Sequence, residues 1–222
     1  MLAVMASVDL PTVLRGWRAA GSLVSRGEPA TSAELARVEV ELGRPLPPEM
    51  LELYAACNGV RLAGGDLALH ALHDADHLGV ANASRQLREW EWPVPPELLV
   101  VGDNGAGEAI GLWVVPDAQH APVVLMGTPT DELNLAVVGT TLAGFLAAST
   151  AYSLPLAAPG DPAVTHCLDE LGVPAQLRGG EDDEDQWALL AWASPDLPDP
   201  RPDPYERPMT PEDITRLARS SR

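Results

Sequence analysis

The sequence predicts an α+β fold, in which a mixed or antiparallel sheet is flanked by helices and followed by a Pro/Asp-rich C-terminal extension. Signals for helix starts and stops fill residues 9–59. Short apolar runs bounded by glycine and proline continue to residue 126, which is typical of strands. Beyond residue 152 the composition changes, because half of the 22 prolines lie between Pro155 and Pro211. We therefore expect a main domain over residues 9–151 and an extension over residues 152–222 that docks on it.

The first expected element is an amphipathic helix over residues 9–24. Asp9 is a suitable N-cap, and Pro11 lies in the first turn, where its missing N–H costs nothing. Apolar residues at helical spacing, Trp17 among them, form one stripe that faces the core. Residues 25–29 are expected to interrupt regular structure before the next helix.

Two short helices joined by a proline elbow are predicted over residues 29–60. Thr31 can cap the first helix, and Glu34 three residues later completes a capping box. Gly43 supplies the left-handed residue that ends this helix. Pro48 suits the first turn of the second helix, and the dipeptide Asn58-Gly59 stops it.

The middle of the chain alternates between strand and helix signals. We expect three to five mostly antiparallel strands, and two helices at 82–90 and 139–150. The strand segments are 67–71, 98–101, 109–115 and 122–126. Trp90 and Trp92, with the prolines that follow them, form a rigid link into the apolar run at 98–101.

The extension is expected to begin with a helix that Pro162 opens and Gly172 ends. The acidic run Glu181-Asp182-Asp183-Glu184-Asp185 then reads as a solvated loop, and residues 187–193 are apolar enough for a buried strand. Residues 195–208 resemble an extended linker, and Thr210 caps a last helix.

Two strings of residues resemble the core signature of the SUKH superfamily. The first combines Glu41-Leu42-Gly43, Leu46-Pro47-Pro48-Glu49, Leu53-Tyr54 and Asn58-Gly59, and the second is Val101-Gly102-Asp103-Asn104-Gly105-Ala106-Gly107-Glu108. Glu108 stands where the family usually has Asp. The resemblance covers about residues 9–151. It implies that the following residues form the family motif or its structural support: Trp17, Leu42, Gly43, Leu46, Pro47, Pro48, Tyr54, Asn58, Gly59, Gly102, Asp103, Gly105, Gly107 and Glu108.

The SUKH superfamily includes bacterial toxin-immunity proteins and fungal regulators of cell-wall synthesis. The resemblance therefore implies a non-enzymatic protein-binding module, most concretely an immunity-type protein that neutralises a toxin by direct binding. A regulatory or scaffold protein without a toxin partner is the alternative within the same superfamily.

The formal net charge is −18, and all 14 basic residues are arginines. Such a surface repels phosphate backbones, so nucleic-acid binding is not expected. It suits encounter with a basic protein, for example a basic toxin domain, although solubility alone is an equally good reading. Cys57 and Cys167 make no disulfide framework, and no apolar run is long enough to span a membrane. We expect a cytoplasmic protein of unknown oligomeric state.

Three patterns could indicate chemistry. His70, His73 and His77 with two nearby carboxylates could hold a metal in a metal-dependent enzyme, but their spacing matches no metallohydrolase pattern, and solvated loop histidines are the preferred interpretation. Gly105-Ala106-Gly107 precedes strand-like residues rather than the helix that a dinucleotide site needs, so hairpin glycines are favoured. No nucleophile motif is present. We expect no cofactor, no metal and no catalytic residue.

Candidate partner-binding residues fall into three groups, each with a structural alternative. Asp103 and Glu108 either stabilise a turn or contact a partner. Trp90 and Trp92 either pack in the core, which we favour, or anchor an interface. The acidic residues 181–185 either form a solvated loop or occupy the cationic cleft of a partner as a decoy.

Overall fold

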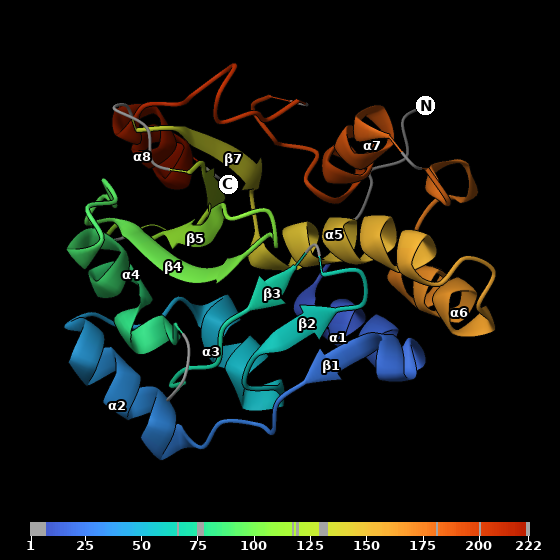
Figure 1. Cartoon of the computed structure of the whole chain (residues 1–222), viewed down its shortest axis with the longest axis horizontal. Helices are drawn as coiled ribbons and strands as arrows, with labels where there is room; N and C mark the ends of the chain where they lie inside the picture. Colours follow the sequence, from blue (N-terminus) through green and yellow to red (C-terminus); the bar gives the residue numbers. More distant parts are fainter. Residues whose placement is uncertain are drawn as a thin grey trace.

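The computed structural model describes residues 8–65, 67–74, 78–116, 118, 120–128, 133–180, 182–199 and 201–220 (Figure 1). Within this part of the chain it has eight α-helices, two short 3-10 helices and seven strands. In chain order they are α1 (Leu10–Ala19), η1 (Gly21–Leu23), β1 (Val24–Arg26), α2 (Ser32–Leu42), α3 (Pro48–Ala56), β2 (Val60–Leu62), β3 (Ala68–Leu69), α4 (Val80–Glu89), β4 (Leu98–Asp103), β5 (Ala109–Trp113), β6 (Val123–Met126), β7 (Leu135–Gly139), α5 (Leu142–Ala157), α6 (Pro162–Leu171), η2 (Ala175–Leu177), α7 (Asp183–Ala193) and α8 (Pro211–Ser220).

The strands form one sheet in the order of the sequence, and every neighbouring pair is antiparallel. The predicted α+β class is confirmed. The expected number of three to five strands is wrong, because β1, β2 and β7 add to the four expected segments, with β1 and β7 at the two edges of the sheet. The strand expected at residues 67–71 is only the two-residue β3. A register shift between Val100 and Gly102 marks a bulge in β4 beside β5.

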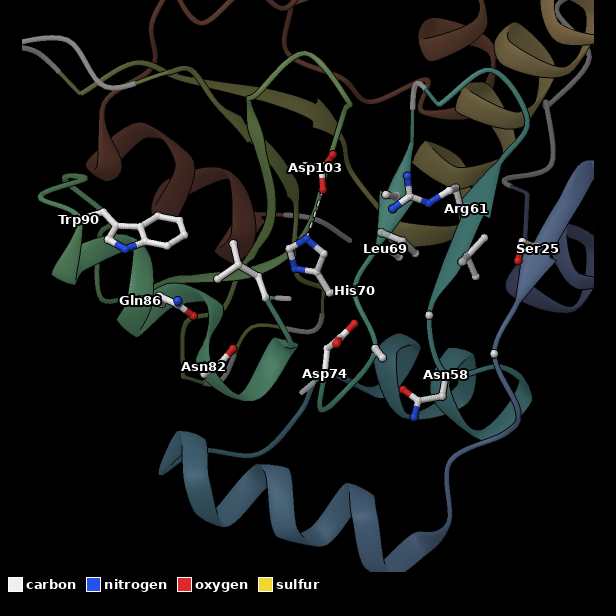
Figure 2. Close-up of a pocket in the computed structure, with 16 residues that line it drawn as sticks. Ser25, Asn58, Arg61, Leu69, His70, Asp74, Asn82, Gln86, Trp90 and Asp103 are labelled. Carbon is white, nitrogen blue, oxygen red and sulfur yellow. Dashed lines mark hydrogen bonds and ion pairs between the residues drawn. The ribbon is translucent and has the colours of Figure 1, made fainter. Parts of the chain in front are cut away.

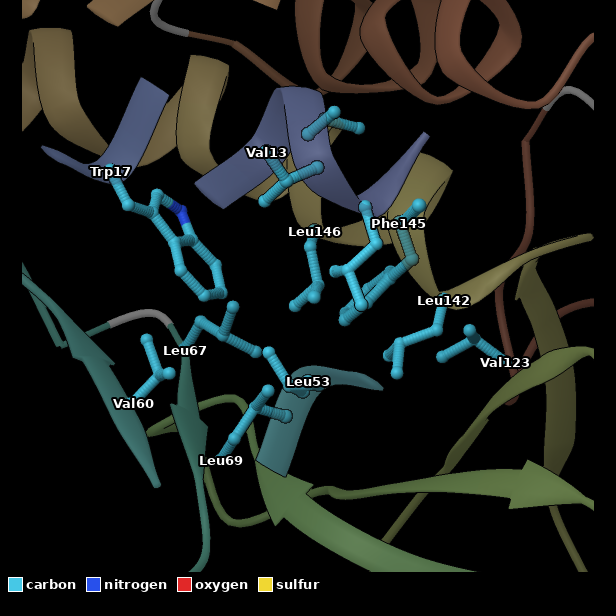
Figure 3. Close-up of a cluster of buried hydrophobic side chains, with 14 of the residues drawn as sticks. Val13, Trp17, Leu53, Val60, Leu67, Leu69, Val123, Leu142, Phe145 and Leu146 are labelled. Atoms are coloured by element: carbon cyan, nitrogen blue, oxygen red, sulfur yellow. The ribbon is translucent and has the colours of Figure 1, made fainter. Parts of the chain in front are cut away.

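The sheet has an inner and an outer face, and each face has its own hydrophobic cluster. The inner cluster joins α1, α3 and α5 to the sheet, with Trp17, Leu53 and Leu146 at its centre (Figure 3). The outer cluster lies between the sheet and the helices α4 and α8. Side chains alternate between the faces along β4, where Leu99 belongs to the inner cluster and Leu98 to the outer one.

The capping signals in the first part of the chain are confirmed. Thr31 and Glu34 form the capping box of α2, with Glu34 N–H donating to Thr31 Oγ1 over 3.2 Å and Thr31 N–H to Glu34 Oε2 over 2.7 Å. Gly43 ends α2 with a φ of 67°, and Pro48 opens α3. The helix expected over residues 9–24 is too long, however. It ends at Ala19, and Gly21, with a φ of 59°, turns the chain so that residues 24–26 become β1 rather than a break.

Two predictions in the last part of the chain are wrong. Residues 187–193 are not a strand but belong to α7, which packs against α5. The acidic run is not a loop, because Asp182 is the N-cap of α7 and Asp183, Glu184 and Asp185 form its first turn. Carboxylates in a first turn interact favourably with the helix dipole and, together with packing on α5, favour a helix for the apolar stretch that follows them. Glu181 lies outside the described residues.

The chain after α5 runs back over the sheet and its helices. α6 packs against α1, and the helix is bounded by Pro162 and Gly172 as predicted. The segment expected as a linker contacts the turn after β6, because Tyr205 Oη accepts Thr128 N–H over 2.8 Å. Just after it, Met209 N–H donates to Leu135 O of β7 over 2.7 Å. α8 then buries Ile214 against the outer cluster, and Trp113 Nε1–H donates to Thr215 Oγ1 over 3.0 Å. None of the helices in the described ranges is long and apolar enough to cross a membrane.

Candidate functional site

A groove of about 840 Å³ lies on the outer face of the sheet, between β1–β3 and α4 (Figure 2). The outer hydrophobic cluster contains residues of β4, β5, β6 and β7 but none of β1, β2 or β3. The helices α4 and α8 therefore cover one half of this face and leave the other half open. Polar side chains line the open half, among them Ser25, Arg61 and His70.

One wall of the groove is a stripe along α4. Asn82, Gln86 and Trp90 follow each other at intervals of four residues, so they lie on the same side of the helix (Figure 2). Trp90 is 55% exposed, although core packing was the favoured expectation. Glu91 has a φ of 65°, which turns the chain sharply after Trp90, and Trp92 then packs against the outer cluster. The turn separates the two tryptophans and leaves the indole of Trp90 at the rim of the groove.

The floor of the groove holds a histidine–carboxylate pair. His70 Nε2 lies 3.3 Å from Asp103 Oδ2, and the side chain of His70 is only 12% exposed (Figure 2). The buried hydroxyl of Tyr54 donates to His70 O over 2.7 Å and fixes the backbone below the imidazole. His70 Nδ1 is buried without a hydrogen-bond partner among the described residues. The expectation of a solvated loop histidine is therefore wrong for His70, whose side chain is largely enclosed and paired with Asp103.

Asp103 is held as an anion. The hydrogen bond from His70 is the main cause that lowers the pKa of the Asp103 carboxyl, and burial acts in the opposite direction. Gly105 N–H, which donates to Asp103 Oδ1 over 3.0 Å, and the guanidinium of Arg61 lower the pKa further. The Asp103 side chain is 42% exposed, so a negative charge faces the groove near neutral pH.

The glycines of the two sequence motifs permit the close approach of the strands that build the groove. A Cβ on Gly102 would lie 2.2 Å from Ala68 O, and Gly59 has a φ of 91°. Between them, Asn58 Oδ1 accepts Leu72 N–H over 2.7 Å and ties the chain after α3 to the segment after β3. The Asn-Gly dipeptide and the strand β4 therefore approach the β3 segment from its two sides.

The second motif ends in a turn that Glu108 stabilises. Asn104 Nδ2–H donates to Glu108 Oε2 over 2.5 Å, and Glu108 N–H donates to Asn104 Oδ1 over 3.2 Å. Gly105 and Gly107 take φ values of 73° and 95° in this turn. Of the two carboxylates proposed as partner contacts, Asp103 lines the groove, and Glu108 is engaged within the turn.

The matching family model is the SMI1 / KNR4 family (SUKH-1), and it matches residues 29–148, more than half of the chain. The chain belongs to this family. The match contains both motifs and therefore confirms the resemblance to the SUKH superfamily. No curated protein matches the chain. The matched range includes most of the residues that line the groove, but not Ser25 and Gly27.

The remaining residues expected from the resemblance to form or support the family motif lie away from the groove. Trp17 is fully buried, and its Nε1–H donates to Thr150 Oγ1 over 2.8 Å in the inner cluster. Leu42 packs on the same cluster near the end of α2. Leu46 is buried, and Pro47 and Pro48 border a separate, mainly apolar hollow of about 510 Å³. These residues shape the scaffold of the domain rather than the groove.

The acidic residues of α7 are not brought to the groove either. Asp182, Asp183, Glu184 and Asp185 form the start of a helix that packs on α5, and none of them lines the groove. Further along α7, the ring of Trp187 contacts Arg201, whose guanidinium lies 5.0 Å from the ring centroid. The structure therefore separates the candidate contacts into a groove set and an α7 set.

The histidines proposed as metal ligands have different partners. His73 Nε2 accepts Arg37 Nε–H over 3.1 Å, and His73 Nδ1 lies 3.7 Å from Glu41 Oε2, whereas His70 pairs with Asp103. His77 lies outside the described residues. Among the described residues, no three His, Cys, Asp or Glu side chains gather as a metal site requires.

Sequence reasoning missed Arg61, Gln86, Asn82 and Ser25, which line the groove. The spacing of Asn82, Gln86 and Trp90 was a usable signal, because polar and aromatic residues four apart form one side of a predicted helix. Nothing in the sequence indicated which strands this side would face.

Proposed function

We propose that this SUKH-1 chain is a non-enzymatic protein-binding module of the immunity type, which neutralises a toxin by direct binding. The observation that carries the proposal is the open half of the outer sheet face, where a polar groove is bordered by a half-exposed tryptophan. Exposed tryptophans are over-represented among residues that dominate binding energy at interfaces. Membership of the SMI1 / KNR4 family supports a binding role of this kind.

The charge of the chain favours a basic toxin domain as the partner. A net charge of −18 on 222 residues produces a negative potential around the whole molecule, which accelerates association with a positive surface. The same charge disfavours nucleic acid as the ligand, since phosphates would be repelled.

The buried thiols support a role without covalent catalysis. Burial raises the pKa of Cys57 to about 11 and that of Cys167 to about 12, so neither thiol is ionised near neutral pH. A thiolate nucleophile is therefore not available at either position. The alternative within the family is a regulatory or scaffold protein without a toxin partner, and a toxin gene beside the gene of this chain would favour immunity over regulation.

The proposal is tested by co-expressing the chain with each toxin domain encoded in the same genome. We expect one toxin, encoded beside this gene, to lose its growth inhibition, and its inactive variant to bind the purified chain one-to-one in calorimetry. The proposed immunity function would be overturned if none of these toxins is neutralised by the chain and none binds to it.

A further inference from the structure

The open half of the outer face is built as a polar surface rather than as an uncovered apolar core. The outward-facing residues of β1 and β2, and the residue after β3, are Ser25, Arg61 and His70, with the small Ala68 on β3 itself, whereas the covered half has mainly leucine, valine and tryptophan at its outward positions. A further apolar helix would leave these polar groups without partners. The groove therefore fits a ligand that brings polar or charged groups of its own.

The exposed indole of Trp90 lies at the groove, where such a ligand can contact it. Its backbone N–H donates to Gln86 O and Leu87 O, each over 3.1 Å, so the residue is fixed to the end of α4. A tryptophan face attracts cations, and among side chains the cation is most often the guanidinium of arginine. The same chain contains this contact elsewhere, between Arg201 and Trp187.

Carboxylates supply the matching negative charge. Asp103 and Asp74 both line the groove between Trp90 and the strands (Figure 2). Asp103 is kept ionised by its contacts with His70 and Gly105, yet a carboxylate accepts more than the two hydrogen bonds that it has here. Arg61 lies on the side of the groove opposite α4, and its guanidinium repels a positively charged ligand there. The positive group of the ligand is therefore directed toward α4.

We propose that the groove is the docking surface for a basic segment of a partner protein, and that it receives an arginine side chain stacked on Trp90 and paired with Asp103. This inference rests on the proposed function, since it names the surface and the chemistry by which the basic partner is recognised. Gln86 is half-buried on α4 one turn before Trp90 and lines the same wall of the groove (Figure 2).

The probe for this inference is a short peptide, N-acetyl-Gly-Arg-Gly-amide, titrated into the isotopically labelled full chain at low salt. We expect the indole Nε1–H resonance of Trp90 and the backbone resonances of His70 and Asp103 to shift with millimolar affinity. The control is the same peptide with citrulline, which has the shape of arginine without its charge. It should bind about five-fold more weakly or worse, because both the ion pair and the cation–π contact are lost.

Variants distinguish binding at the groove from a general attraction of the peptide to the acidic surface of the chain. Asp103→Asn should weaken arginine-peptide binding about five-fold, and Trp90→Ala should weaken it by at least as much. Asp183→Asn, which removes the same charge from α7, should change it less than about two-fold. Gln86→Glu should strengthen binding and Gln86→Arg should weaken it, and a folding defect cannot produce these opposite changes.

The inference is overturned if the arginine and citrulline peptides bind equally, if the shifts map to α7, or if Asp183→Asn weakens binding as much as Asp103→Asn. Those results would not contradict the proposal that the chain neutralises a toxin. Conversely, failure to neutralise any toxin would not change the result of the peptide titration. The two proposals therefore fail in different experiments.

Discussion

Single side chains decide the geometry of the SUKH-1 groove, and Tyr54 is the plainest case. Its phenol is fully enclosed below β3 and makes one hydrogen bond, to the carbonyl of His70. Burial raises the pKa of this phenol, so it remains a neutral donor. The hydroxyl thus holds the backbone from which the imidazole reaches Asp103.

Tyr54→Phe should lower the free energy of unfolding by about 1–2 kcal/mol, because His70 O then loses its buried donor. Urea denaturation followed by circular dichroism measures the loss. We also expect the resonances of His70 and Asp103 to shift in the variant. An unchanged midpoint together with unchanged resonances would show that the phenol does not position the floor of the groove.

Asp103 makes the stability of the chain depend on pH in the acid range. Its pKa in the folded chain is lower than in the unfolded chain, so its stabilising contribution is complete above the ordinary carboxyl value near 4 and is lost as the pH falls through the folded-state pKa. Asp103→Asn should therefore lose less stability than the wild type between about pH 5 and pH 3. Thermal melts across that range provide the measurement, and parallel slopes for the two proteins would contradict it.

At the scale of elements, the capped helices are the parts that local chemistry determines. In α2 the Thr31 and Glu34 side chains satisfy backbone groups that the helix itself cannot, and Gly43 adopts the left-handed conformation that ends it. The boundaries of such a helix depend on neighbouring residues alone, which explains why α2, α3, α6 and α8 follow the predictions from the sequence closely.

Thr31→Ala should therefore destabilise the chain by about 1 kcal/mol, because Glu34 N–H loses its acceptor at the start of α2. The adjacent Ser32→Ala is the matched control and should stay within about 0.5 kcal/mol of the wild type. Equal losses in both variants would mean that the capping box contributes nothing specific.

Elements set by distant contacts were harder to predict. The strand β1 has three residues and β3 has two, which is too short for an alternating pattern to be read. The apolar residues of α7 favoured a strand, and the preceding carboxylates that cap the helix were interpreted as a loop. The groove depends on β1, β2, β3 and α4 meeting in space, so Asp103 and Trp90 could be singled out from the sequence but not placed together.

At the scale of the whole molecule, we propose that residues 152–222 fold together with the rest of the chain. Ile214 on α8 is fully buried against the outer cluster, and Met209 bonds to the edge strand β7. Ile214→Ala should then lower the stability of the whole chain by about 2–4 kcal/mol in one cooperative transition. The exposed Arg216→Ala should change it by less than about 0.5 kcal/mol. A separate, early transition confined to the C-terminal residues would contradict the joint fold.

The net charge gives a second prediction at this scale. If a basic toxin domain is the partner, its association rate with the chain should fall at least about ten-fold when salt rises from about 20 mM to 500 mM, and the dissociation rate should change much less. Stopped-flow measurement of the intrinsic tryptophan fluorescence of the mixture gives both rates. A salt-independent association rate would show that the −18 charge does not steer the encounter.

The most direct test is to locate the bound partner on the surface of the chain by photo-crosslinking. p-Benzoylphenylalanine replaces Trp90 at the rim of the groove in one variant and Val40, 81% exposed on α2, in another. The inactive toxin domain encoded beside the gene is added to each variant. We predict crosslinks from position 90 and none from position 40. Crosslinks from position 40 alone would show that the partner binds a different face and that the groove is not the binding site.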